Sequence, residues 1–171
     1  MWKLETPRLL LRELTVNDAE NLFSLNADPE VIKWTGDETF PSVEAARAFL
    51  ESYTAYQETG MGRWAVELKE TGEFIGWCGL KVHTDSGAVD LGFRLKQSVW
   101  NHGLATEAAK ACLDYGFNHL GLLIIIGRVH PGNAASKRVL EKCGLTFWEK
   151  GFDHETDIDI YRIINLTGMI H

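Results

Sequence analysis

The chain has 171 residues, of which 45% are hydrophobic, and this length and composition suit one globular domain with a substantial core. No stretch approaches the roughly 18 consecutive apolar residues of a membrane helix, and the N-terminal residues MWKLETPR carry charges where a signal peptide is apolar, which predicts a soluble cytoplasmic protein. The formal net charge of −7 argues against direct binding to nucleic acid, where contacts to phosphate dominate.

The first third of the chain predicts one strand and several helices. The expected elements are a strand at Arg8–Arg12, a short helix at Ala19–Asn26 and a longer helix at Val43–Thr59. Residues 15–18 offer caps for the short helix, and Ser42 is the expected cap of the longer one, which Gly60 ends. Asp28-Pro29 begins a further turn or short helix between them.

The remaining two thirds predict the sheet. Strands are expected at Trp64–Leu68, Phe74–Val82, Val89–Leu95 and Leu122–Val129, and near Thr146–Gly151 and Asp157–Asn165. Helices are expected at Leu104–Asn118 and from Asn133 or Ala134 to Cys143. The first of these helices is long enough for a crossover between parallel strands. The predicted fold class is α/β of the α+β type, with helices flanking a mixed and mostly antiparallel sheet.

The cysteines give no sign of a metal or redox centre. Cys78, Cys112 and Cys143 are odd in number, widely spaced and surrounded by apolar residues, and no C-x-x-C pair is present. The pattern predicts three buried thiols in a reducing compartment, and no metal cofactor.

A candidate ligand site lies where the helix at 104–118 begins. The segment from Trp100 to Ala108 reads WNHGLATEA, and the small residues Gly103 and Ala105 would let a ligand approach the backbone closely. The first amides of a helix lack intrahelical acceptors and suit a phosphate. Neither a Walker loop nor the dinucleotide pattern G-x-G-x-x-G is present, and an ordinary helix start remains an alternative for this motif alone.

A second motif follows the apolar strand at 122–129. It reads HPGNAASKRVLEKCGL, from His130 to Leu145. Together the two motifs strongly resemble the GNAT superfamily of N-acetyltransferases, and within it the subgroup of ribosomal-protein alanine and serine N-acetyltransferases. The first motif is similar to the family's pyrophosphate loop, although Asn101 replaces the common Gly. The second is similar to N-x-x-S-x-x-x-L-E-K-x-G-F, with Leu145 where Phe is usual. Because the opening ETPRLLLR is also similar, the resemblance spans nearly the whole chain.

The resemblance implies that residues 1–171 form a single acetyltransferase domain and that acetyl-coenzyme A is the cosubstrate. It should lie in a cleft where the strand at 89–95 splays from the strand at 122–129. The residues implied to bind it, largely through backbone groups, are Phe93, Arg94, Leu95, Asn101, His102, Gly103, Leu104, Ala105, Thr106, Asn133 and Ser136. Gly92 fits a bulge, a close approach or plain packing. Lys137 and Arg138 are further candidates for the adenosine phosphates, or simply exposed helix cations.

Amide formation also needs a neutral amine and a stabilised thiolate. Many family members supply a Tyr as the acid, but the corresponding residue here is Leu140, so Ser136 is the candidate donor to the sulfur; the alternative is a helix Ser that bonds backbone. Asp90 is the favoured candidate for the base. The other candidates for the base are His83, Glu107 and Glu13. The resemblance implies direct transfer, without a Cys nucleophile.

The acceptor is expected to be a primary amine, with a peptide or protein N-terminus favoured. The alternatives are a small amine, such as a polyamine, an aminoglycoside or an amino acid, and a non-catalytic sensor of acyl-coenzyme A. The aromatic residues expected around the acceptor pocket are Trp34, Phe40, Trp64, Trp77 and Trp148, although core packing is their commoner fate. The sequence implies neither nucleic-acid nor membrane partners, and it leaves a homodimer open.

Overall fold

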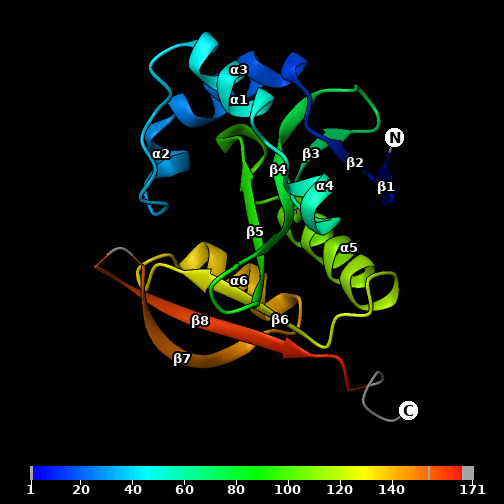
Figure 1. Ribbon diagram of the computed structural model, residues 1–171, viewed down its shortest axis with the longest axis vertical. Helices are drawn as coiled ribbons and strands as arrows, with labels where there is room; N and C mark the ends of the chain where they lie inside the picture. Colours follow the sequence, from blue (N-terminus) through cyan, green and yellow to red (C-terminus); the bar gives the residue numbers. More distant parts are fainter. Residues whose placement is uncertain (1, 154, 167–171) are drawn as a thin grey trace.

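An eight-stranded sheet organises the part of the chain that the computed structural model describes, residues 2–153 and 155–166 (Figure 1). The strands are β1 (Lys3–Glu5), β2 (Leu9–Glu13), β3 (Arg63–Leu68), β4 (Phe74–Val82), β5 (Val89–Leu95), β6 (Ile124–Val129), β7 (Thr146–Asp153) and β8 (Thr156–Ile164). The helices are α1 (Ala19–Ala27), α2 (Pro29–Ile32), α3 (Val43–Glu51), α4 (Ala55–Thr59), α5 (Leu104–Asn118) and α6 (Ala134–Lys142), with 3₁₀ turns η1 (Val16–Asp18) and η2 (Gln97–Val99).

The strand order is β1-β2-β3-β4-β5-β6-β8-β7, and the only parallel neighbours among the described strands are β5 and β6, which α5 connects. These two strands pair at a single position, Asp90 with Ile126, and then diverge. In Figure 1, β5 runs vertically toward α1 and α3, whereas β6 and β8 turn away below it. The predicted fold class and the predicted splay are therefore confirmed.

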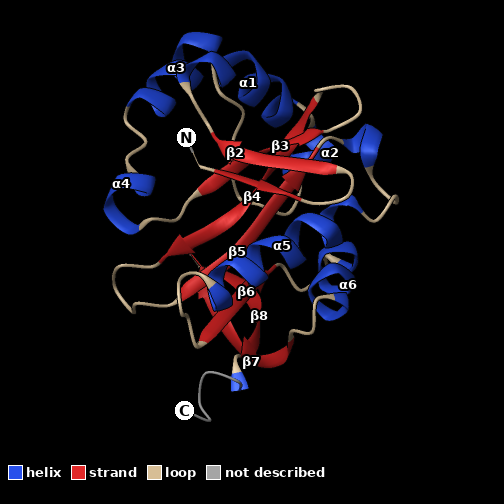
Figure 2. Ribbon diagram, turned by 90° about the vertical axis from the view of Figure 1, so that its right-hand side faces the viewer, coloured by secondary structure: helices blue, strands red, loops and turns tan. Residues whose placement is uncertain are grey.

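Alternating side chains on the central strands divide the core into two layers. Trp64 and Cys78 face α5 and are fully buried with Ala108 and Cys112. On the opposite face, Trp77 packs with residues of α1 and α3. Figure 2 shows α1 and α3 together at one end of the molecule, with α5 and α6 beside β5 and β6. None of the helices in the described ranges is long and apolar enough to cross a membrane.

Two features of the N-terminal third differ from the prediction. The helix expected at residues 43–59 is two helices, α3 and α4, although its predicted cap is correct, since the Ser42 hydroxyl accepts from the Ala45 amide at 3.1 Å. After the break, the Tyr53 hydroxyl accepts from the Arg63 amide at 2.7 Å and the Tyr56 hydroxyl donates to the Arg63 carbonyl. These contacts with β3 favour two short helices over one long helix. Strand β1 was not predicted.

Candidate active site

The loop between β5 and α5 is held in a sharp turn. The Trp100 indole Nε1 donates to the Leu95 carbonyl at 2.9 Å, which ties the loop back to the end of β5. Asn101 (φ +67°) and Gly103 (φ +76°) both adopt left-handed backbone conformations. Asn is among the few residues other than Gly that adopt this conformation readily. Asn101 can therefore adopt a left-handed turn at the position where the family usually has Gly.

The first turn of α5 offers backbone donors to a ligand. Gly103 is the N-cap residue and provides no side-chain acceptor, and the first amide bonded to it is that of Glu107. Within residues 2–153 and 155–166, no group accepts a hydrogen bond from the amides of Leu104, Ala105 or Thr106. Three amides at the positive end of a fifteen-residue helix fit a pyrophosphate group.

The Glu107 side chain stabilises this loop through hydrogen bonds with Thr6 and Arg8. Its carboxylate accepts from the Thr6 hydroxyl at 2.5 Å, the Arg8 amide at 2.9 Å and the Arg8 Nε at 2.7 Å. Arg8 Nη1 in turn donates to the His102 carbonyl at 2.9 Å. Burial alone would raise the pKa of Glu107, but the bonds from Thr6 and Arg8 outweigh it and hold the pKa below its usual value. A carboxylate so occupied is a poor candidate for the base.

The edge of β5 that faces β6 is open beyond Asp90, because the two strands no longer pair there. This leaves the stretch from Gly92 to Leu95 available to an added extended group. The Leu95 carbonyl is already bonded to Trp100, so this part of the predicted pantetheine edge is partly engaged. Gly92 is not at a bulge, since its register with β4 is continuous; a Cβ there would lie 3.3 Å from Trp77 Cζ3. Gly92 therefore serves a close approach of the indole.

The start of α6 presents two free polar groups on the other side of the splay. The Asn133 Oδ1 caps the helix by accepting from the Ser136 amide at 3.1 Å. The Asn133 side-chain Nδ2 and the Ser136 hydroxyl make no hydrogen bond with any described residue, so the structure gives no support to the alternative in which the Ser136 hydroxyl bonds to backbone. Leu140 is 2% exposed and packs against Gly127 in the core.

Asp90 and His83 form a pair at the apex of the splay. His83 Nε2 lies 3.0 Å from Asp90 Oδ2, and the two side chains are 17% and 18% exposed. Asp90 and Gly92 are two residues apart and therefore lie on the same face of β5, at a separation of about 7 Å. The structure brings two of the four base candidates, Asp90 and His83, together beside the open edge of β5.

Several other candidates either lie away from this site or already have a structural partner. Glu13 is on β2, which β3 and β4 separate from β5 by about 14 Å. Trp64 is 1% exposed and stacks on Trp2 in the core, and Trp148 lies on β7, where Arg162 stacks on it. The Lys137 ammonium is paired with Asp159 at 2.8 Å. Trp64 thus has the core packing that was its alternative fate, whereas the exposed Trp148 stays a candidate for the acceptor pocket.

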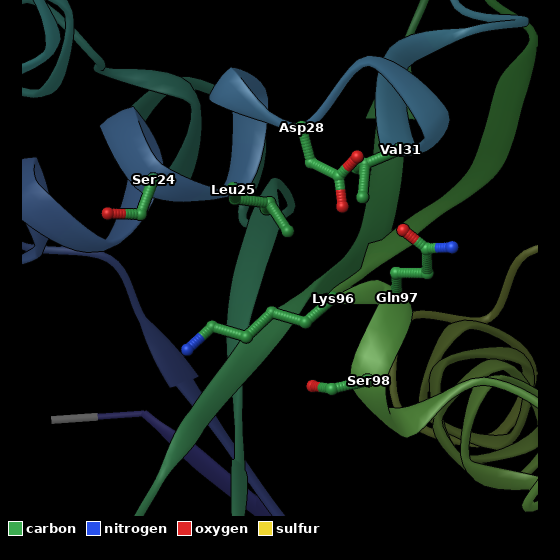
Figure 3. Close-up of a pocket in the computed structure, with 7 residues that line it drawn as sticks. All are labelled: Ser24, Leu25, Asp28, Val31, Lys96, Gln97 and Ser98. Atoms are coloured by element: carbon green, nitrogen blue, oxygen red, sulfur yellow. The ribbon is translucent and has the colours of Figure 1, made fainter.

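A cavity of about 500 Å³ opens beside the end of β5 (Figure 3). Helices α1 and α2 supply one wall, and the residues after β5 supply the other. The lining residues are Ser24, Leu25, Asp28, Val31, Lys96, Gln97 and Ser98. The sequence analysis did not single out Lys96, Gln97 and Ser98 as site residues. Their position between the end of a strand and the loop motif could have indicated that they line a pocket.

Trp34 connects the two sides of the splay. Its ring lies 4.7 Å from the His130 ring, centroid to centroid, and a Cβ at Gly132 would lie 3.0 Å from Trp34 Cη2. The segment after α2 therefore touches the loop between β6 and α6. Trp34 and Trp77 remain candidates for the acceptor pocket, whereas Phe40 packs on Phe49 beneath α3.

The three cysteines are free and buried, as predicted. Burial raises the pKa of Cys143 to about 11, which argues against a thiolate nucleophile. In residues 2–153 and 155–166, no group of three or more His, Cys, Asp or Glu side chains could hold a metal ion.

The eight-stranded mixed sheet, which splays at its one parallel pair among the described strands, matches the fold of GNAT acetyltransferases. Residues 8–146 match the GNAT acetyltransferase domain family, and the chain belongs to this family. It is 36% identical over 143 residues to the uncharacterized N-acetyltransferase YoaA of Bacillus subtilis. The aligned region covers 82% of this chain and 81% of that protein.

Two further comparisons concern named activities. The chain is 34% identical over 162 residues to the FsC-acetyl coenzyme A-N(2)-transacetylase of Aspergillus fumigatus, covering 88% of this chain and 67% of that protein. RimL, a ribosomal L7/L12 alpha-N-protein acetyltransferase solved in complex with coenzyme A, shares the fold with a TM-score of 0.82 and 14% identity, covering 95% of this chain and 98% of the other. The chain is thus an N-acetyltransferase of GNAT type.

Proposed function

We propose that this N-acetyltransferase moves the acetyl group of acetyl-coenzyme A directly to the α-amino group of a peptide or protein. The proposal rests mainly on the splay of β5 from β6. These two strands pair only where Asp90 of β5 lies, and they diverge beyond it. The splay has an open strand edge on one side and unpartnered polar groups on the other. A cosubstrate arm and an amine could therefore meet there.

The chain's own groups fit the cosubstrate along its length. The amides of Leu104, Ala105 and Thr106 would hold the pyrophosphate, and the left-handed turns at Asn101 and Gly103 leave these amides accessible. The backbone between Phe93 and Leu95 would pair with the pantetheine as an added strand does. The Asn133 side-chain Nδ2, which no described residue engages, would donate to the same arm.

The reacting groups follow from the two sides of the splay. Acetyl-coenzyme A supplies an activated acetyl thioester. The amine nitrogen bonds to the carbonyl carbon as the C–S bond breaks, so one proton must leave the nitrogen and the sulfur must be stabilised. We assign the first task to the Asp90–His83 pair, which lies beside Gly92, and the second to the unengaged Ser136 hydroxyl.

The choice of an α-amine rests on proton equilibria. An α-amino group has a pKa of about 7.7–8.0, so on the order of a tenth of it is neutral at pH 7. A Lys side chain has a pKa of about 10.4, so only a few in ten thousand are neutral. Asp90 and His83 are the only base candidates that remain beside the splay. Such a modest base favours the amine that is neutral more often.

The named relatives support nitrogen acceptors of this kind. RimL is named for the α-nitrogen of a ribosomal protein, and the Aspergillus fumigatus protein for N(2) of FsC. The second name concerns a different acceptor, so a small amine is the main alternative. A non-catalytic acyl-coenzyme A sensor is a further alternative, which only the replacement of the family's Tyr by Leu140 favours.

Thiol release from acetyl-coenzyme A tests the proposal. The acceptors are peptides with free N-termini beginning with Ser, Ala or Met, the same peptides with blocked N-termini and one internal Lys, and polyamines and aminoglycosides. The highest kcat/KM is expected for a free N-terminus. A higher value for blocked Lys peptides or polyamines would overturn the α-amine assignment, and the absence of release with every acceptor would favour the sensor.

A further inference from the structure

Three side chains form a cationic cluster on the sheet face that α1 and α3 cover. Trp77 of β4 pairs with Arg94 of β5 and with Ala65 of β3, and Arg63 lies two residues before Ala65 on the same face. The guanidinium carbon of Arg63 is 4.6 Å from the Trp77 ring centroid, and that of Arg94 is 5.3 Å from it. Both arginines therefore contact the same indole.

Arg94 is fixed in place. Its Nη1 donates to Asn26 Oδ1 at 2.9 Å and its Nη2 to Asp37 Oδ2 at 2.7 Å. The side chain is 7% exposed, and its Nε–H is buried without an acceptor among the described residues. A buried donor without a partner is rare in folded proteins. The arginine thus retains both its charge and one unused hydrogen bond.

Arg63 has no ionic partner within residues 2–153 and 155–166. Its backbone is held by Tyr53 and Tyr56, but its guanidinium makes no hydrogen bond or ion pair with any described residue. It stacks instead against Trp77 and against Phe49, whose ring centroid is 5.8 Å away. Burial, followed by the nearby charge of Arg94, lowers the pKa of Arg63. Arg63 is partly buried, and buried charges are normally paired, so an anion beside it would supply the missing partner.

The local charge balance is positive in a chain whose formal net charge is −7. Two guanidinium groups face one carboxylate, that of Asp37, which is 46% exposed and already bonded to Arg94. One further negative charge would balance the cluster. A carboxylate matches the planar fork of a guanidinium, which it can bind through two parallel hydrogen bonds.

The cluster also borders the place of transfer. The Trp77 ring lies over Gly92, since a Cβ there would be 3.3 Å from Cζ3 and 3.5 Å from Cη2. Gly92 directly precedes the open backbone of Phe93, to which the proposed function assigns the pantetheine arm. An anion beside Trp77 would therefore belong to the acceptor, close to its amine.

We propose that Arg63 and Arg94, on either side of Trp77, bind a carboxylate of the acceptor, so that the substrate is an amine with a carboxylate near it. The inference rests on the proposed function of the splay. The carboxylate has two chemical sources: the α-carboxylate of a free amino acid, or an acidic side chain near a peptide N-terminus. Arg63 is the direct ligand, while Arg94, held by Asn26 and Asp37, supplies charge and its free Nε–H.

Matched acceptors test the proposal, because each pair differs only in a carboxylate. The pairs are alanine with alaninamide, and the peptide amides Asp-Ala-NH₂ with Asn-Ala-NH₂ and Ala-Asp-NH₂ with Ala-Asn-NH₂, each measured across pH so that the neutral amine can be compared. At least one carboxylate member should have a kcat/KM about ten- to a hundredfold above its partner, as expected for a charge-assisted hydrogen bond. The pair that discriminates identifies the source.

Substitutions at Arg63 test whether this residue causes the preference for acceptors with a carboxylate. Arg63→Gln should remove the preference by raising KM for the carboxylate member alone, and Arg63→Lys should restore part of it. Arg47→Gln, on the exposed face of α3, is the matched control and should change nothing. Calorimetry with the N-acetylated forms of the same compounds, in the presence of coenzyme A, gives a readout independent of turnover, and coenzyme A affinity should be the same in all variants.

Failure of the carboxylate site and failure of the proposed function give different experimental results. If α-amines react but neutral members are preferred, or Arg63→Gln leaves the preference unchanged, the carboxylate site is wrong and the proposed function stands. If no α-amine reacts, the proposed function fails. The carboxylate site is then decided by calorimetry alone, where equal binding of N-acetylalanine and N-acetylalaninamide, and of the acetylated Asp and Asn peptides, overturns it.

Discussion

The substitution Glu107→Gln tests whether Glu107 stabilises the loop before α5 or acts as the catalytic base. Gln keeps one oxygen that can accept from Thr6 or from the Arg8 amide, but it loses the negative charge. The ion pair with Arg8 is partly exposed, at 50% for Arg8 and 17% for Glu107, so its loss costs up to about 1 kcal/mol. Weakening one charge-assisted hydrogen bond costs about 1 kcal/mol more. The expected loss of stability is about 1–2 kcal/mol, which lowers Tm by about 2–8 °C.

The same change should affect cosubstrate binding more than the chemical step. Arg8, released from Glu107, holds the His102 carbonyl less firmly. The KM for acetyl-coenzyme A is therefore expected to rise about two- to tenfold, while kcat stays within about twofold of wild type. Thiol-release kinetics and thermal unfolding measure both effects. Glu44→Gln, in the exposed first turn of α3, is the control and should leave KM unchanged.

The opposite result is equally clear. Loss of a general base lowers kcat by about a hundred- to ten thousandfold. If Glu107→Gln lowers kcat to that extent while Tm and KM remain those of wild type, Glu107 is the base, and the assignment of this task to Asp90 and His83 is wrong.

Three other predictions concern single residues. Gly103→Val should weaken coenzyme A binding at least about tenfold in calorimetry, because a β-branched residue is strained at φ +76° and crowds the loop; Gly72→Val has the same φ of +76° in a distant turn and should leave affinity unchanged. Ser136→Ala should lower kcat by roughly ten- to a thousandfold with little change in cosubstrate affinity, and a loss seen only in affinity would make Ser136 a binding residue. Burial would raise the pKa of Asp18, but bonds from Arg12 and the Thr15 amide hold it below its usual value, so its stabilising effect is present above about pH 4 and is lost at lower pH. Urea unfolding from pH 3 to 7 should show a stability gap between wild type and Asp18→Asn that narrows below about pH 4, and a constant gap would contradict this.

Elements with a strong local pattern could be predicted from the sequence. The bounds of β4, β5 and α5 agree with the prediction, because each combines clear periodicity with turn residues at both ends. Strand β1 could not be predicted, since it has three residues and depends on pairing with β2 and on Trp2, which stacks on Trp64 at 4.2 Å. Its stability comes from residues distant in sequence.

The candidate site also contains parts that could be predicted from the sequence and parts that could not. The loop at Asn101 and Gly103 and the cap at Asn133 were predictable, because each motif is contiguous. The brace on Glu107 joins residues about one hundred positions apart, and the Arg63–Trp77–Arg94 cluster depends on the register of three strands. Neither could be read from spacing in the sequence.

Acetyl-coenzyme A should bind in the splay between β5 and β6. Amide hydrogen exchange, measured with and without the cosubstrate, tests this placement. Exchange should slow at residues 92–95, 101–106 and 133–136, and remain unchanged in the groove between β1 and α5, where Thr6, Lys110 and Asp114 lie. Slower exchange in that groove, with the three segments unaffected, would show that the cosubstrate binds elsewhere.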